Sequence, residues 1–182
     1  MSITSVKSGA TGISLALDNN FMEPIATTLV GSGGANQVTF LDIPQNYKHL
    51  QIRGIARGVS NTFGDLTFNG NTGNNYAFHD IYGDGASAGA EQSTSRANIP
   101  VTALPNVADI FNGFVMDILD YANTNKNKTT RTLSGRDTNG GGVIYFLSGL
   151  WQNTNAITSL SIIPRIGNIA QHSRFSLYGI KG

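Results

Sequence analysis

The chain has no cysteine, only five prolines and few charged residues among its 182 residues. Without cysteine, no disulfide framework and no thiolate metal site can form, so packing and strand pairing must stabilise the fold. Charged residues make up 13 % of the sequence, and the formal net charge is +1. Because that balance provides no long-range field for nucleic acid or anionic lipid, neither is expected as a partner.

Long apolar runs are missing as well, although 40 % of the residues are hydrophobic. No run is long enough to cross a bilayer, so no membrane insertion is expected. Residues 1–6 lack a charged segment followed by an apolar stretch, which argues against a secretory signal peptide. If the protein reaches the outside of a cell, we therefore expect it to leave by lysis or inside a particle.

Glycine, with 22 residues, divides the chain into short segments rich in Val, Ile, Thr, Phe and Tyr. Such segments between turn signals are typical of strands. Phe114, Met116 and Ile118 alternate with more polar neighbours, so residues 106–122 resemble a strand more than a helix. Gly54 interrupts the alternation of residues 48–57 and predicts a bulge there. The other expected strands are residues 26–30, 37–41, 65–69, 76–82, 129–135, 143–150, 157–163 and 173–180.

Eight to ten such strands predict an all-β fold, a β-sandwich or jelly roll, over residues 23–182. Residues 1–22 are small and polar, with a few apolar side chains, and are too short to fold alone. We expect this segment to be an extended N-terminal arm for assembly or anchoring, because its apolar residues alternate as in an added strand. The candidate assembly residues are Ile3, Val6, Ile13, Leu15 and Leu17.

Catalytic motifs are weak. Residues 85–89 match the G-x-S-x-G spelling of a hydrolase nucleophile, but polar residues follow where a helix is required. Residues 83–95 are therefore interpreted as a long surface loop. Asp117 and Asp120 are the only close acid pair that a glycan depolymerase could use, and in a strand they point to opposite faces. No catalytic residue is assigned.

Metal and cofactor motifs are equally sparse. His49, His79 and His172 are not spaced as zinc ligands, and no cofactor fingerprint occurs. Oxygen-bearing residues at 69–75 and 80–84 could supply calcium ligands, but turn chemistry explains them equally well. The basic residues Lys126, Lys128, Arg131 and Arg136 are interpreted as a solvated hairpin that Asp117 and Asp120 could pair with across strands.

A sugar-binding face remains a second hypothesis, because tyrosine and asparagine side chains are typical of such faces. The candidate glycan-facing residues are Tyr76, Tyr82, Asn71, Asn74 and Asn75. Trp151 fits a lectin-like platform or a core anchor, and the core is the commoner place for a lone tryptophan. Residues 148–151 and 175–180 are expected in the core, and loops 69–75 and 83–95 are expected to face outward.

Several phrases occur in order along nearly the whole chain from residue 25. They are IPQNYKHLQIR at 43–53, NGNTGNNY at 69–76, DILDYAN at 117–123 followed by KNKT, SGLW at 148–151 followed by NAIT, and SRFSLYGIKG at 173–182. Together they resemble virion proteins of tailed bacteriophages, notably cyanophages and marine phages, which end in a similar SLYGIKG.

This resemblance implies a β-sandwich domain of the tail-fibre or head-decoration type, displayed on the particle and assembled as a trimer. The matching phrases contain no catalytic residues. We therefore expect a non-enzymatic virion protein that contacts other virion proteins as a homotrimer, in a capsid decoration, head fibre, short tail fibre or baseplate. The protein would be part of the virion, assembled in the host cytoplasm and released by lysis, and it would contribute to host attachment. The alternative is a carbohydrate-binding module that recognises a host surface glycan.

Overall fold

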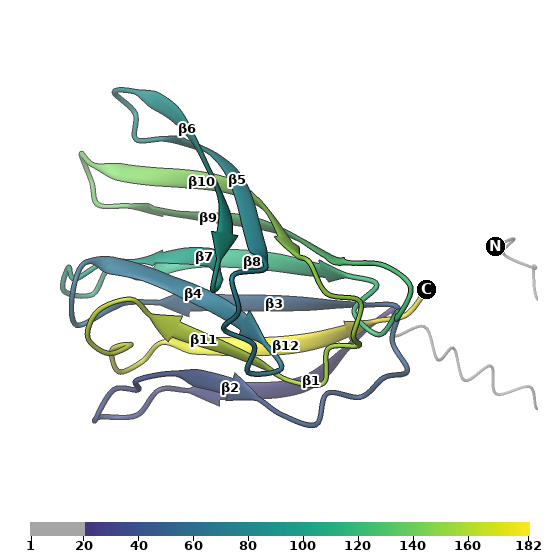
Figure 1. Ribbon diagram of the computed structural model, residues 1–182. Helices are drawn as coiled ribbons and strands as arrows, with labels where there is room; N and C mark the ends of the chain where they lie inside the picture. Colours follow the sequence, from purple (N-terminus) through teal and green to yellow (C-terminus); the bar gives the residue numbers. More distant parts are fainter. Residues whose placement is uncertain (1–20) are drawn as a thin grey trace, which may run out of the picture.

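The computed structural model describes residues 21–182, which form twelve strands and no helix (Figure 1). The strands are β1 (Met22–Leu29), β2 (Val38–Phe40), β3 (His49–Ala56), β4 (Thr62–Phe68), β5 (Tyr76–Gly83), β6 (Ala88–Arg96), β7 (Ile99–Leu104), β8 (Asn112–Leu119), β9 (Lys128–Asp137), β10 (Gly142–Trp151), β11 (Leu160–Pro164) and β12 (Arg174–Ile180). Accordingly, no helix of the described part could cross a membrane.

The strands form two sheets. The large sheet has eight strands in the order β1-β12-β3-β8-β9-β10-β5-β6, and the small sheet has four in the order β2-β11-β4-β7. Every neighbouring pair is antiparallel. Figure 1 shows the small sheet lying over one face of the large sheet, with β6 and β1 at opposite edges. This arrangement confirms the predicted β-sandwich, whereas the jelly roll stays a prediction.

Strand alternation explains which residues form the core. In β8, for example, buried and half-buried residues alternate from Asn112 to Leu119, as expected for a strand with one face covered. The inner face of the large sheet packs on the small sheet around fully buried Leu50, Met116 and Leu177. Trp151 is also buried, and its ring stacks on Tyr76 with 6.1 Å between centroids. The core role of Trp151 is confirmed.

Gly54 does not form the predicted bulge, because β3 pairs with β8 and β12 without a register shift. A Cβ at Gly54 would lie 2.5 Å from the Phe114 ring, so the glycine is there to admit that ring. The register shifts lie elsewhere, between Pro24 and Ala26, between Gly64 and Asp65, and between Tyr76 and Phe78.

The two ends of the sandwich differ in what they carry. β1 begins beside the end of β12, because Met22 pairs with Ile180, and we call this end the terminal end. Antiparallel pairing then places the connections 84–87, 138–141 and 165–173 at the opposite end, and Figure 1 shows two hairpins, β5–β6 and β9–β10, projecting there. Loop 69–75, which precedes Tyr76 at the end of the β5–β10 pair, lies at the terminal end.

Most expected strands are present, with bounds shifted by a few residues. The expectation of a long loop over residues 83–95 was wrong, because only Asp84 to Ser87 form a turn and β6 follows. β7 was not predicted either. The expected core segments are half correct: Gly149 and Trp151 are buried, whereas Ser148 is exposed because it lies on the other face of β10.

Candidate functional site: the outer face of the large sheet

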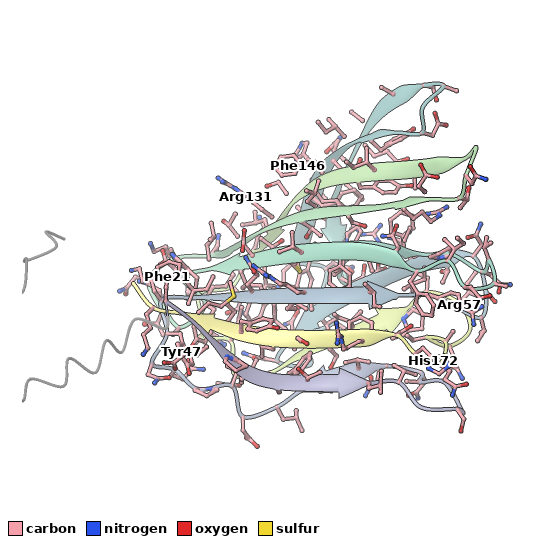
Figure 2. The ribbon with its side chains drawn as sticks, turned by 180° about the vertical axis from the view of Figure 1, so that it is seen from behind. Phe21, Tyr47, Arg57, Arg131, Phe146 and His172 are labelled. Carbon is pink, nitrogen blue, oxygen red and sulfur yellow. The ribbon has the colours of Figure 1, made fainter. Side chains whose placement is uncertain are left out.

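The outer face of the large sheet, which the small sheet does not cover, carries a continuous apolar row. Residues in direct register on five successive strands form it: Val115 on β8, Leu133 on β9, Phe146 on β10, Ile81 on β5 and Ala90 on β6. Leu133, Phe146 and Ile81 are 47 %, 49 % and 59 % exposed. Figure 2 shows this face, with Phe146 labelled on it. Contiguous exposed apolar side chains of this kind mark interaction sites.

The same cross-strand row is polar on the remaining strands. It continues from Val115 through Arg53 and Ser176 to Thr27. The Arg53 Nε donates to Gln51 Oε1 at 2.6 Å, and its guanidinium lies 5.9 Å from the centre of the Tyr178 ring. Along this row, the outer face is therefore apolar over β9, β10, β5 and β6, which we call the apolar half, and polar over β3, β12 and β1, which we call the polar half.

A groove crosses this face beside the row. Its floor includes Gly113 and Gly135, which pair with each other across β8 and β9. A Cβ at Gly113 would meet nothing closer than 4.0 Å, so the missing side chain leaves open space. Ile55 and Ile144 stand on either side, and Arg174 lies at the polar end. The groove can therefore hold an extended chain or a ligand with an apolar and a polar part.

A second hollow lies at the apolar end, against β6. It is lined by Ile81, Ala88, Ala90, Ile144 and Phe146, with Leu133 and the backbone around Gly83 completing it. No charged side chain lines it. The two alanines are small enough to leave a gap between Ile81 and the open edge of the sheet, so the hollow extends to that edge.

Beneath the apolar row, the inner face of β9 is polar and buried. Lys128, Thr130, Thr132 and Ser134 are all at most 2 % exposed. The Lys128 Nζ donates to the carbonyl oxygens of Asn123, Lys126 and Thr154 at 2.6, 2.9 and 3.0 Å. Burial lowers the pKa of Lys128, and the three carbonyls satisfy its ammonium. The prediction of a solvated basic hairpin was therefore wrong for Lys128.

Asn112 provides a second buried polar contact between the sheets. Its Nδ2 donates to Thr102 Oγ1 and to Ser134 Oγ, both at 2.6 Å, which links β8, β7 and β9. Buried polar groups stabilise a fold only when they are hydrogen-bonded. This cluster and Lys128 therefore fix the position of β9, whose outer face carries Leu133.

Acidic side chains do not assemble into a catalytic pair. Asp117 accepts a hydrogen bond from Gln51 Nε2 at 2.7 Å on the outer face. Asp120 lies in the next loop, where Lys126 and Lys48 bind its two oxygens at 2.6 and 3.3 Å. The Lys126 hydrogen bond, with Lys48 beside it, holds the pKa of Asp120 below its usual value, which is the opposite of what a general acid requires. The predicted pairing of Asp120 with these bases is confirmed for Lys126.

Asp80 and Glu91 face each other across β5 and β6, a pair that the sequence analysis did not single out. Asp80 is 9 % exposed, and its Oδ1 accepts from the Glu91 backbone N–H at 3.1 Å. Burial raises the pKa of Asp80, the hydrogen bond opposes this, and the charge of Glu91 raises it further. A cross-strand register, which no short motif encodes, brings the two together.

The G-x-S-x-G motif forms the turn between β5 and β6. Asp84 Oδ1 accepts from the backbone N–H of Ala86 and Ser87 at 2.9 and 2.7 Å and also contacts the Ser87 hydroxyl. Strand and tight turn replace the strand-to-helix elbow that the chemistry needs. Ser87 is thus part of turn chemistry, as interpreted from the sequence.

The candidate glycan-facing residues do not form one surface. Tyr76 is fully buried, and its hydroxyl accepts from Phe68 N and donates to Asn71 O at 3.0 Å each. Tyr82 packs on the inner face against Tyr145, with 5.8 Å between the ring centres. Asn74 is exposed, whereas Asn71 and Asn75 are half-buried. The expectation was therefore wrong for Tyr76, which holds loop 69–75 in place from inside.

The loops expected to face outward lie at opposite ends of the sandwich. Loop 69–75 is at the terminal end, and the short turn that remains of loop 83–95 is at the other. Within the described residues, His, Cys, Asp and Glu nowhere gather in groups of three that could hold a metal ion. The candidate arm residues Ile3, Val6, Ile13, Leu15 and Leu17 lie outside the described residues.

The outer face itself was missed by the sequence analysis. Its signal was present in residues 143–147, where apolar side chains follow one another without alternation, so that Ile144 and Phe146 had to face away from Val143, Tyr145 and Leu147. Comparisons with models of protein families, with curated proteins and with solved structures found no match.

Proposed function

We propose that this chain is a non-enzymatic structural protein of a tailed-phage virion, displayed on the particle exterior as a homotrimer. The observation that carries the proposal is the apolar row that runs across five strands from Val115 to Ala90, with Leu133, Phe146 and Ile81 about half exposed. A surface of this kind is suited to packing against another protein. The order of the five sequence phrases that resemble phage virion proteins supports the setting.

The arrangement of the two ends fits display. Anchoring through the segment that precedes β1 would place the terminal end towards the particle and the β5–β6 and β9–β10 hairpins away from it. The exterior parts would then be short, polar turns such as Asp84 to Ser87. Capsid decoration, head fibre, short tail fibre and baseplate component all remain within this proposal.

Antibody labelling of intact particles tests it. Antibodies raised against the purified chain are applied to particles of a phage that encodes this sequence, and the gold label is located by electron microscopy. We expect label on the outside of intact particles at a fixed site on the head or tail. Absence of the chain from purified particles, shown by mass spectrometry, would overturn the proposal.

A second candidate function, recognition of a host surface glycan, is favoured by the polar half of the outer face. Arg53, Arg174 and Tyr178 line one groove there, and an aromatic ring beside hydrogen-bond donors is a common arrangement for sugars. Binding to a panel of bacterial surface polysaccharides tests it. Arg174→Ala should weaken binding about tenfold, the loss of about one hydrogen bond to a charged group. Asn74→Ala, in the terminal-end loop, should leave it unchanged.

A further inference from the structure

β6 is the least protected of the four sheet edges in the described part of the chain. β1 contains Pro24 and a bulge, β2 has three residues, and β7 contains Pro100. From Ala88 to Ser93, β6 has neither proline nor lysine and pairs regularly with β5, and its one charged side chain, Glu91, lies on the inner face, away from Ala88 and Ala90. Because a bare edge offers unpaired N–H and C=O groups to any strand, proteins normally block it or cover it.

The apolar hollow ends at this same edge. A strand added beside β6 would place its outward side chains next to Ala88 and Ala90. Those alanines are too small to fill the space, so larger apolar side chains on the added strand would reach Ile81 on β5 across Ala90. A strand that is complementary to this edge and hollow would therefore be short and uncharged, with bulky apolar residues at every second position.

Residues 13–17, with the sequence ISLAL, have this pattern. Ile13, Leu15 and Leu17 alternate with the small residues Ser14 and Ala16, and the segment has no charged residue. We propose that β6 of one copy receives residues 13–17 of a second copy as an added strand, with Leu15 over the hollow. The inference rests on the proposed homo-oligomer and names the contact that holds it together.

Chain length requires the donor to be another copy. Phe21 lies at the start of β1, and β6 is seven strand positions away across the large sheet (Figure 1), about 34 Å at the usual spacing. Ala90 also lies five residues along the strands, in the row of Thr27, which adds about 17 Å in that direction. A fully extended chain from Phe21 back to Leu15 spans only about 20 Å, and back to Ile13 about 27 Å. A subunit therefore cannot reach its own β6.

This geometry makes the contact head-to-tail, because each copy donates from the β1 side and accepts on the β6 side. Such contacts close into a ring when the rotation between copies permits it. Three copies per ring would match the proposed homotrimer. The contact would cover the most exposed end of the apolar row.

Engineered disulfides test the contact directly, since the chain has no native cysteine. Neighbouring strands bring Cα atoms within disulfide range. In the full chain, Leu15→Cys with Ala90→Cys should form disulfides between subunits on mild oxidation, seen as covalent multimers on non-reducing gels. The matched control is Leu15→Cys with Thr27→Cys, which places the second cysteine on the opposite edge. A disulfide within one chain in this control, or no multimers with Ala90→Cys, would overturn the proposal.

Light scattering provides the second measurement. The full chain should have about three times the mass of one 19.3 kDa subunit, and Leu15→Asp or Ala90→Asp should each give the monomer. Thr27→Asp should leave the oligomer intact. An oligomer that survives both Leu15→Asp and Ala90→Asp would overturn the arm contact. Particle labelling is independent of it, so a failed arm contact with labelled particles leaves the virion proposal standing.

Discussion

Strands β3 and β12 on one side of the large sheet and strand β9 on the other differ in which face carries their polar side chains. In β12 and β3 the inner residues Phe175, Leu177 and Ile52 are apolar and buried, and the outer residues Ser176 and Arg53 are polar. In β9 the order is reversed, with Lys128, Thr130 and Ser134 buried inside. There Leu133 is 47 % exposed outside.

In the apolar half, β9 therefore has polar side chains on its buried face and an apolar side chain on its exposed face. Its inner polar groups include a lysine satisfied by three carbonyls and an Asn112–Ser134 hydrogen bond. Thr130 Oγ1 and Asn112 Oδ1 are buried there without a hydrogen-bond partner in the described part of the chain.

Among the described residues, the outer side chains Phe146 and Ile81 of the apolar half are 49 % and 59 % exposed. The polar half also exposes Leu29 and Ile55, but Arg174 lies between them in register, so they form no continuous row. We propose that a partner covers the apolar row.

The largest expected effect on stability is a difference between alanine substitutions at two adjacent residues of β10. Leu147 is 1 % exposed, so Leu147→Ala should destabilise the fold by about 3 kcal/mol through lost burial and a cavity. Phe146 is 49 % exposed, so Phe146→Ala should change the free energy of unfolding of the monomer by less than about 0.5 kcal/mol.

Urea denaturation measures both, in the Leu15→Asp background so that dissociation does not contribute. Equal losses from the two variants would mean that Phe146 is packed within the subunit, and the contrast between the faces would be wrong.

The next effect concerns the buried lysine. Lys128→Met keeps the length and apolar stem of the side chain but removes the donor to Asn123, Lys126 and Thr154 carbonyls. Leaving these acceptors without their ammonium should cost about 2 kcal/mol. Lys126→Met is the matched control on an exposed side chain, and it should cost less than about 1 kcal/mol. A Lys128→Met chain as stable as the unsubstituted one in urea would show that the carbonyls find other partners.

A structural feature could be predicted from the sequence when its signal lies within one segment, and not when it depends on several segments. Alternation along one strand is a local signal, and it predicted β3 and β8. β6 was missed because Ala88, Gly89 and Ala90 have low strand propensity, and β7 was missed because Pro100 is tolerated only on an edge.

The candidate site needed information that no single segment contains. Leu133, Phe146 and Ile81 meet only through the register of three strands, and β5 is far from β10 in the sequence. Lys128 sits in a run of lysine and asparagine that is typical of a solvated loop, and only the fold brings Thr154 to it. The individual strands were therefore predictable, whereas the surface that they build together was not.

Two glycines give a smaller contrast between the faces. A Cβ at Gly149, on the inner face, would lie 2.4 Å from Thr130 Oγ1 and 2.6 Å from Ile99 Cγ2, so Gly149→Ala should cost about 2 kcal/mol by overpacking. At Gly113, on the outer face, the nearest atom would be 4.0 Å away, so Gly113→Ala should be neutral or stabilising by about 0.5 kcal/mol. Thermal unfolding of the two variants measures both changes in stability. A loss of stability in Gly113→Ala as large as in Gly149→Ala would contradict an open outer groove.

The smallest expected effect is a substitution at Asp80 that stabilises the fold. Burial raises the pKa of Asp80 in the folded chain, and the nearby Glu91 carboxylate raises it further. The folded state therefore binds this proton more tightly than the unfolded state, so the contribution of Asp80 to stability is present below its usual pKa of 3.8 and is lost as the pH rises through the raised value. At neutral pH the buried charge is unfavourable.

Asp80→Asn should accordingly stabilise the chain by about 0.5 kcal/mol at pH 7, because the amide oxygen still accepts from Glu91 N–H while the charge is gone. Below pH 3 the variant and the unsubstituted chain should converge. Asp84→Asn is the control with the reverse sign, since hydrogen bonds from Ser87 and Ala86 lower the pKa of Asp84 and favour its charge. If Asp80→Asn destabilised the chain at pH 7 in urea titrations, the charge of Asp80 would be stabilised by a contact beyond the Glu91 N–H, and burial would not be the main effect on this carboxylate.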